Sequence, residues 1–197
     1  MQNKRLILAS NSPRRIALLK TLGYPFAVVP HDTEESVSYD VSPDDLVQRL
    51  ACQKAEDVAQ RVGNAIIIGA DTIVLLNHCI LGKPVDASDA LRMLSMLSNA
   101  AHEVLTGVCM VEMPSKKKLL RFDRTHIKMK YITGEEIEAY IKSGEPMDKA
   151  GAYAVQGMGR QFVEEITGSY SNVVGLPLEL VKEMLDHFIN DKNAKKF

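Results

Sequence analysis

The sequence predicts an α/β protein in which helices flank a mixed β-sheet. Over the first hundred residues, helix-opening signals alternate with short apolar runs rich in β-branched residues. Two long strand-like segments follow, separated by a turn that contains proline, and this pattern is typical of a β-hairpin. Because helical crossovers join parallel strands and hairpins join antiparallel ones, the sheet is expected to be mixed.

The first two helices have clear start signals. Ser12 is a good N-cap, Pro13 suits the first helical position and Gly23 suits the position just after the helix. Ser42, followed by Pro43 and two aspartates, opens a second helix in the same way. We therefore expect strands at residues 5–9, 26–29, 65–70 and 72–76, and helices at residues 13–22, 43–62 and 87–97.

The second half contains the hairpin and two further helices. Strands at residues 103–111 and 119–131 are joined by a turn at residues 114–118. Thr133 and Glu136 form a capping box that opens a helix ending near Gly144. We expect a strand at residues 162–166, a loop at 168–175, a helix at 177–188 and a frayed tail at 190–197. No repeat or linker interrupts residues 1–197, so the chain is predicted to be one domain.

Composition and charge narrow the function classes. The 197 residues include 24 Lys and Arg against 25 Asp and Glu, a net charge of −1, which argues against a dedicated nucleic-acid or membrane-surface binder. No apolar run approaches the ~20 residues that span a bilayer or the ~7–15 of a secretion signal. Cys52, Cys79 and Cys109 are widely spaced and never form CxxC, which is typical of a reduced, cytoplasmic protein without a zinc site.

The turn between the first strand and the first helix is a candidate anion site. It contains Ser10, Ser12, Arg14 and Arg15, and a helix N-terminus favours negative charge. Two arginines are electrostatically unfavourable in a first turn unless an anion lies there. The turn therefore indicates either a phosphate site or an ordinary capped helix with solvated arginines.

Lys54 lies near the centre of an apolar stripe on the second helix, among Val47, Leu50, Ala51 and Val58. A lysine in that position must extend to solvent, pair with a buried acid or project into a pocket. Because the other members of the stripe are apolar, we favour the pocket.

Asp71 interrupts the apolar central strand. A carboxylate there is costly unless it binds a cation, accepts hydrogen bonds or acts as a base; alternatively, it ends one strand and caps a turn. Gly69 allows another group to approach the backbone closely. Lys83 lies on a rigid turn between Gly82 and Pro84, which is either a second functional lysine or part of a surface loop.

Two weaker signals complete the candidate set. Glu34 and Glu35 follow the second strand, and one of them is a candidate to join Asp71 in holding Mg²⁺, since adjacent strand residues point to opposite sides. An acidic pair on a solvated surface is the alternative. Gln156 follows a run of small residues that admits a flat ligand, and its amide carries the donor and the acceptor that read one edge of a base. Tight strand packing with an incidental glutamine is the alternative.

Six segments resemble, in this order and spacing, the Maf family: LILASNSPRR, RLACQKA, IIGADTIV, LGKP, DKAGAYAVQG and GSYSNVVGLP. The resemblance runs from about residue 5 to residue 188. It implies a cytoplasmic nucleoside triphosphate pyrophosphatase with two lobes around a nucleotide cleft, similar to inosine triphosphatase, and often a homodimer. It also implies hydrolysis between the α and β phosphates with a divalent cation, Mg²⁺ or Mn²⁺.

The same resemblance gives the candidate residues roles. Asp71 falls on the catalytic acidic position of the family, regarded as the proton acceptor, and Lys54 and Lys83 fall on its lysines. Glu35 falls on a further acidic position and would hold the metal together with Asp71. A positioned base typically accelerates proton transfer about 10²–10⁴-fold.

The substrate side follows from the same matches. Ser10 and Arg14, with Arg15 beside them, lie on the phosphate-side turn of the family. Arg14, Thr72 and Gln156 together resemble the branch that prefers dTTP and UTP, and the branch acting on 7-methyl-GTP carries different residues at these positions.

We therefore expect a hydrolase of acid anhydrides that acts on dTTP, UTP and modified pyrimidine triphosphates. Two alternatives stay open. One is a non-catalytic, nucleotide-binding regulator of septum formation or cell division, and the other is a pyrophosphatase for 7-methyl-GTP or a modified purine. We expect no nucleic-acid and no membrane partner.

Overall fold

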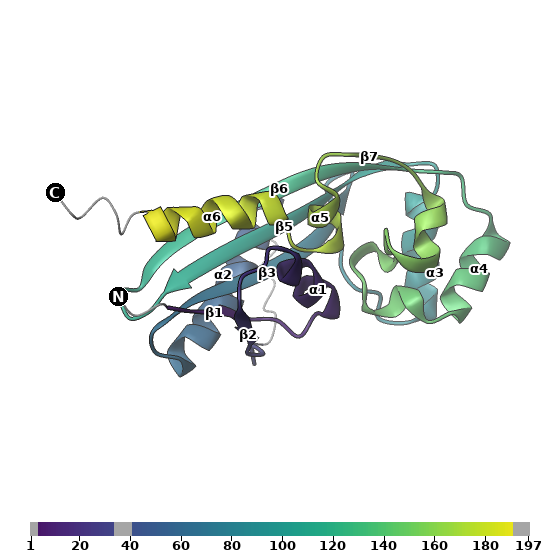
Figure 1. The fold of residues 1–197 in the computed structure, drawn as a ribbon. Helices are drawn as coiled ribbons and strands as arrows, with labels where there is room; N and C mark the ends of the chain where they lie inside the picture. The colour runs from purple at the N-terminus through teal and green to yellow at the C-terminus, as the bar shows by residue number, and fades with distance from the viewer. Residues whose placement is uncertain (1–3, 34–40, 191–197) are drawn as a thin grey trace. The chain divides into compact units, whose positions relative to one another are not determined.

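Residues 4–33 and 41–190 are described by a computed structural model (Figure 1). The chain divides into two units. Unit 1 comprises Met1–Asp71, Thr106–Asp123 and Gly175–Phe197, and unit 2 comprises Thr72–Leu105 and Arg124–Val174. Glu34, Glu35 and the tail predicted beyond residue 190 lie outside the described residues.

Seven strands within the described residues form one mixed sheet. The strand order is β2-β1-β3-β5-β6-β7, and β4 pairs with β3. β1 is parallel to β2 and β3, whereas the pairs β3–β4 and β6–β7 are antiparallel. The strands are β1 (Arg5–Leu8), β2 (Phe26–Val28), β3 (Ala65–Leu76), β4 (Cys79–Leu81), β5 (Ala101–Glu112), β6 (Lys117–Met129) and β7 (Val163–Thr167). The predicted mixed α/β class is confirmed.

Unit 1 is a three-layer arrangement with a helix-covered sheet. One face of the sheet packs against α1 (Pro13–Thr21) and α6 (Leu178–Asn190), and α6 runs along the hairpin strands in Figure 1. The opposite face packs against α2 (Pro43–Arg61). Neighbouring residues of one strand alternate between the two layers, as strand geometry requires: Ile66 and Ile68 contact the α1/α6 side, and Ala65 and Ile67 contact the α2 side.

Unit 2 contains the remaining helices. α3 (Ala87–Leu97) packs against α4 (Gly134–Lys142) and against a short 3₁₀ turn, η2 (Ala150–Ala152). Two further 3₁₀ turns, η1 (Glu145–Asp148) and η3 (Gly157–Phe162), flank η2, and α5 (Tyr170–Val174) follows β7. No helix in the described part of the chain is both long and apolar enough to cross a membrane.

The capping signals placed the helices well. Ser12, Ser42 and Thr133 are the N-caps of α1, α2 and α4, and each side chain accepts a backbone N–H hydrogen bond from the first turn. Both bonds of the predicted capping box of α4 are present. The expected loop at residues 168–175 is wrong in part, because it contains α5.

Candidate functional site

The turn that follows β1 is built around two serine hydroxyls. Ser10 is buried, and its Oγ accepts a hydrogen bond of 3.1 Å from the Ser12 N–H. Ser12 caps α1 by accepting the Arg15 N–H at 3.4 Å. The sequence folds in this way because serine offers a side-chain acceptor to N–H groups that have no partner inside the helix. The turn is thus a fixed backbone loop at a helix N-terminus, where anions are favoured.

The two arginines of this turn differ. The Arg15 Nε donates to the Gly175 carbonyl at 2.8 Å, so its side chain connects the start of α1 to the segment before α6. Arg14, the preceding residue, is half-buried. Gly175 belongs to the last of the six segments described above, and Arg15 to the first. Arg15 and Gly175 both belong to unit 1, so this hydrogen bond connects residues of the two segments within that unit.

Lys54 and Asp71 form a buried ion pair. The Lys54 Nζ donates to Asp71 Oδ1, and the two residues come from α2 and β3. Of the three possibilities for Lys54, the structure shows pairing with a buried acid and not the projection into a pocket that we favoured. Asp71 does not end a strand, because β3 continues to Leu76. Replacing either residue would remove this ion pair and leave the other charged group buried without it, which is costly in the interior.

Two glycines let α2 lie directly on the sheet at this point. A Cβ on Gly69 would come within 2.2 Å of the Ala51 carbonyl oxygen, and one on Gly107 within 2.3 Å of the Val47 carbonyl oxygen. The close approach predicted at Gly69 is therefore confirmed. It brings the backbone of α2 against β3 a few residues from Lys54 and Asp71.

Strand register relates the serine turn to the ion pair. Leu8 pairs with Ile68 in the parallel register of β1 and β3, and the Ala9 N–H donates to the Ile68 carbonyl at 2.8 Å. Ser10 and Asp71 follow on the carboxyl side of this last paired position. Ligands of open α/β sheets bind beyond the carboxyl ends of parallel strands, which makes this edge of unit 1 the candidate active site.

Lys83 and Gln156 belong to unit 2, as does Thr72. The Gly82–Lys83 turn is held by a hydrogen bond of 2.9 Å from the Gly151 N–H to the Gly82 carbonyl, which joins two of the six segments. Lys83 and Gln156 are both exposed. The alternative of tight strand packing around Gln156 is wrong, because this segment runs through the 3₁₀ turns η2 and η3.

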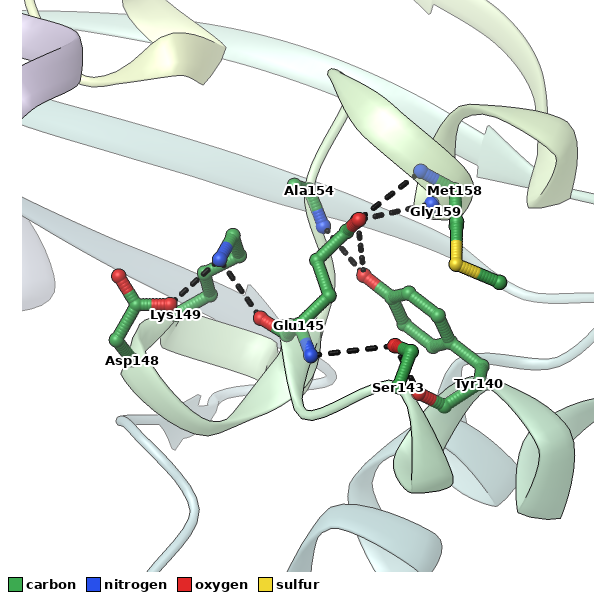
Figure 2. Close-up of polar contacts among 8 residues, drawn as sticks. All are labelled: Tyr140, Ser143, Glu145, Asp148, Lys149, Ala154, Met158 and Gly159. Carbon is green, nitrogen blue, oxygen red and sulfur yellow. Dashed lines mark hydrogen bonds and ion pairs between the residues drawn. The ribbon is translucent and has the colours of Figure 1, made fainter.

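A carboxylate that the sequence did not single out organises the chain around Gln156. Glu145 accepts hydrogen bonds from the Tyr140 hydroxyl at 2.9 Å, the Met158 N–H at 3.0 Å and the Gly159 N–H at 3.1 Å (Figure 2). Burial by itself raises the pKa of Glu145, but the hydrogen bonds from Gly159, Met158 and Tyr140 outweigh it and leave the pKa below its ordinary value.

The described residues contain no group of three or more His, Cys, Asp and Glu side chains that could hold a metal ion. Mg²⁺ needs fewer protein ligands than that, since it commonly takes one or two carboxylates plus substrate phosphates. The Asp71 carboxylate, at the carboxyl side of the paired strands, has the oxygen chemistry that such a cation requires. The second predicted ligand, Glu35, lies outside the described residues.

Comparisons with known proteins identify the family. Residues 5–188 match the family model described as "Maf-like protein". The chain belongs to the family of Maf-like proteins. A relative from Ruminiclostridium cellulolyticum is 46% identical over 98% of this chain and 100% of its own length. One from Dictyoglomus turgidum is 50% identical over 94% of this chain and 96% of its own, and one from Bacillus cereus is 48% identical over 97% and 94%. All three relatives are named dTTP/UTP pyrophosphatase.

In this Maf-like protein the sequence candidates fall into two described groups. Unit 1 contains Ser10, Arg14, Arg15, Lys54 and Asp71, and unit 2 contains Thr72, Lys83 and Gln156. Glu145 and Tyr140 were missed, because a glutamate after a helix gives no local signal of its own. The two glycines that approach them, Gly157 and Gly159, were visible in the sequence as a Gly-x-Gly pair, but only the fold shows what they approach.

Proposed function

We propose that this chain is a nucleoside triphosphate pyrophosphatase that hydrolyses dTTP, UTP and modified pyrimidine triphosphates. The products would be the nucleoside monophosphate and pyrophosphate, and the activity would remove excess or non-standard pyrimidine nucleotides. The observation that carries the proposal is the buried Lys54–Asp71 pair at the carboxyl side of β1 and β3. The relatives named dTTP/UTP pyrophosphatase support it, since they match this chain over nearly its full length.

In the proposed reaction, a water oxygen attacks the α phosphorus, and the bond from that phosphorus to the bridging oxygen breaks. Asp71 accepts the proton of the water, and pyrophosphate leaves with the bridging oxygen. Lys54 holds the Asp71 carboxylate in place through their ion pair. Such hydrolysis depends mainly on positioning and on neutralising phosphate charge, so a carboxylate fixed on a strand is well suited to the base role.

In this proposal, positively charged groups bind the phosphates of the substrate, and an amide side chain contacts its base. The α1 N-terminus, Ser10 and Arg14 bind phosphate oxygens, and Lys83 adds a second positive charge. Arg15 supports the same turn through its hydrogen bond to the Gly175 carbonyl. Thr72 and Gln156 contact the nucleoside, with the Gln156 amide on the base edge.

A divalent cation, Mg²⁺ or Mn²⁺, is part of the proposal, with Asp71 and Glu35 as its protein ligands. When bound, it would neutralise phosphate charge and acidify the attacking water. We also propose that the protein acts in the cytoplasm as a homodimer, without nucleic acid. Light scattering on protein eluting from a size-exclusion column would give the mass of the assembly. A monomer would contradict the proposed homodimer.

The direct test measures pyrophosphate release with Mg²⁺ or Mn²⁺ from dTTP, UTP, CTP, ITP, 7-methyl-GTP and 5-substituted pyrimidine triphosphates. We expect turnover of dTTP, UTP and their 5-substituted relatives, and its loss in Asp71→Asn. Turnover of 7-methyl-GTP alone would keep the reaction and overturn the pyrimidine preference. Folded protein that binds nucleotide but releases no pyrophosphate would instead favour the non-catalytic regulator.

A further inference from the structure

The residues on either side of Gln156 are attached to one tyrosine–glutamate pair. On one side, the Ala154 N–H donates to the Tyr140 hydroxyl at 3.3 Å. On the other side, the N–H groups of Met158 and Gly159 donate to the Glu145 carboxylate. Because Tyr140 also donates to Glu145, both flanks of Gln156 are bonded to the same two side chains. Figure 2 shows the hydrogen bonds that Ala154, Met158 and Gly159 make to this pair.

This pair is itself well anchored. Tyr140 lies on α4 with an exposed fraction of 1%, and its ring packs edge-on against Phe162 at a centroid distance of 5.2 Å. Glu145 follows at the start of η1, where the Ser143 hydroxyl accepts its backbone N–H at 3.2 Å and Lys149 donates to its carbonyl at 2.7 Å. The backbone of Glu145 is therefore fixed by Ser143 and Lys149, neither of which belongs to the segment that the carboxylate holds.

The glycines of the segment are a consequence of this arrangement. A Cβ on Gly157 would lie 2.6 Å from Glu145 Oε2, and one on Gly159 would lie 2.6 Å from the Tyr140 hydroxyl oxygen. Gly157 also has φ +71, a conformation that side chains disfavour. Only glycine at both positions lets the backbone come this close to the pair.

Glu145 also replaces Gln156 in a capping role. Gln156 is the N-cap residue of η3, but its side chain makes no capping hydrogen bond. The N–H groups of Met158 and Gly159, the second and third residues of η3, donate to Glu145 instead. The Gln156 side chain, which is exposed, therefore does not cap its own turn.

We propose that Glu145 and Tyr140 are positioning residues that hold Gln156 at one place on the pyrimidine edge and so set the preference for uracil and thymine over cytosine. This inference rests on the proposed function, in which Gln156 contacts the base. An amide carries one donor group and one acceptor and can adapt to several base edges if its backbone moves. A backbone held at both flanks removes that freedom, and selectivity then follows from preorganisation.

The test compares kcat/KM for UTP and CTP in four proteins: the unmodified chain, Glu145→Gln, Tyr140→Phe and Glu136→Gln. Glu145→Gln replaces one acceptor oxygen with an NH₂ group that faces a backbone N–H. Tyr140→Phe removes the hydroxyl that joins Ala154 to Glu145. Glu136→Gln is the matched control, because it weakens a carboxylate cap at the other end of α4, where Glu136 accepts the Thr133 N–H.

We expect the UTP:CTP ratio to fall about tenfold in Glu145→Gln and Tyr140→Phe and to stay unchanged in Glu136→Gln, even where the melting temperatures fall equally. In a Gln156→Ala background, Glu145→Gln should have no further effect on the ratio. Hydrogen exchange at the Met158 and Gly159 amides should accelerate in Glu145→Gln, which reports the released segment directly.

The outcomes separate the two proposals. If the unmodified chain hydrolyses no pyrimidine triphosphate, the proposed function is overturned. The positioning role is then tested on binding alone, by the ratio of the dissociation constants for UTP and CTP. An unmodified chain that prefers UTP, with an unchanged ratio in Glu145→Gln, overturns the positioning role alone. Equal kcat/KM values for UTP and CTP in the unmodified chain would also overturn the positioning role. So would a UTP:CTP ratio that Gln156→Ala leaves unchanged.

Discussion

Lys54 on α2 and Asp71 on β3 pair inside unit 1 with side chains only 5% and 10% exposed. Each residue is the counter-charge of the other, so the two cannot be understood separately. Charged residues this deeply buried are rarely kept for stability, since a well-packed apolar pair often serves as well or better. A base that must be held in a fixed place is a reason to keep them.

The stability losses from replacing Lys54 and Asp71 should not be additive. We expect Asp71→Asn and Lys54→Met each to lower the free energy of unfolding by about 3–5 kcal/mol, because each removes the ion pair and keeps one of its two buried charges in place. The double variant should lose clearly less than the sum. Urea denaturation measures all three, and additivity within about 0.5 kcal/mol would contradict the coupling. None of the three should release pyrophosphate from UTP.

A methyl group on Gly69 should separate α2 from β3. We expect Gly69→Ala to destabilise the fold by about 1–3 kcal/mol and to lower kcat for UTP, since the Cβ would meet the Ala51 carbonyl at 2.2 Å. Gly63→Ala is the matched control, because a Cβ there meets nothing within 4 Å. Thermal melts and initial rates are the measurements, and equal behaviour of the two variants would refute the close-packing argument.

The two neighbouring arginines should separate into a binding and a structural residue. Arg15→Met removes the hydrogen bond to the Gly175 carbonyl and should cost about 1–3 kcal/mol of stability. Arg14→Met should raise KM for UTP about tenfold, through the loss of one charge on the phosphates. Initial rates over a range of UTP concentrations give KM, and an unchanged KM in Arg14→Met would contradict its binding role.

Histidine 102 should make the fold sensitive to acid. His102 is 3% exposed, its Nδ1 has no hydrogen-bond partner, and burial lowers its pKa from 6.5 to about 4. The unfolded chain takes up this proton below pH 6.5, whereas the folded chain does so only near pH 4, so stability falls as the pH drops through this range. At about 1.4 kcal/mol per pH unit, the loss approaches about 3 kcal/mol.

The His102 contribution is isolated by substitution. His102→Gln keeps a polar side chain facing the Tyr153 hydroxyl, which contacts the His102 Nε2 at 2.7 Å, and should flatten the dependence between pH 6.5 and 4. The control is His126→Gln, at a side chain that is 61% exposed. Denaturation curves at several pH values give the comparison, and parallel curves for His102→Gln and the unmodified chain would contradict the prediction.

Local signals explain how much of the fold was predictable. Ser12, Ser42 and Thr133 satisfy N–H groups within their own helices, so sequence neighbours alone determine those starts. β4 was missed because it has three residues and follows a tight turn at Asn77 and His78, which adopt positive φ without glycine. α5 was missed because it has five residues between two glycines, and such a segment resembles a loop.

The candidate site was predictable residue by residue but not as a set of contacts. An isolated charge in an apolar stripe or strand indicated Lys54 and Asp71 separately, and only the packing of α2 on β3 shows that they are partners. The hydrogen bond from Arg15 to Gly175 spans 160 residues, and the role of Glu145 depends on N–H groups 13 and 14 residues later. Sequence rules based on neighbouring residues do not identify a hydrogen-bond partner at that separation.

Unit 1 is assembled from three stretches of chain, the last of which begins at Gly175. Its core takes Val181, Met184, Leu185 and Phe188 from α6. A ribosome adding about 5–20 residues per second would deliver this helix roughly 10–40 s after β1. During that interval, Leu6 and Ile66 lack their final covering layer. The nascent protein therefore has a period in which a chaperone that shields apolar strands would raise its yield.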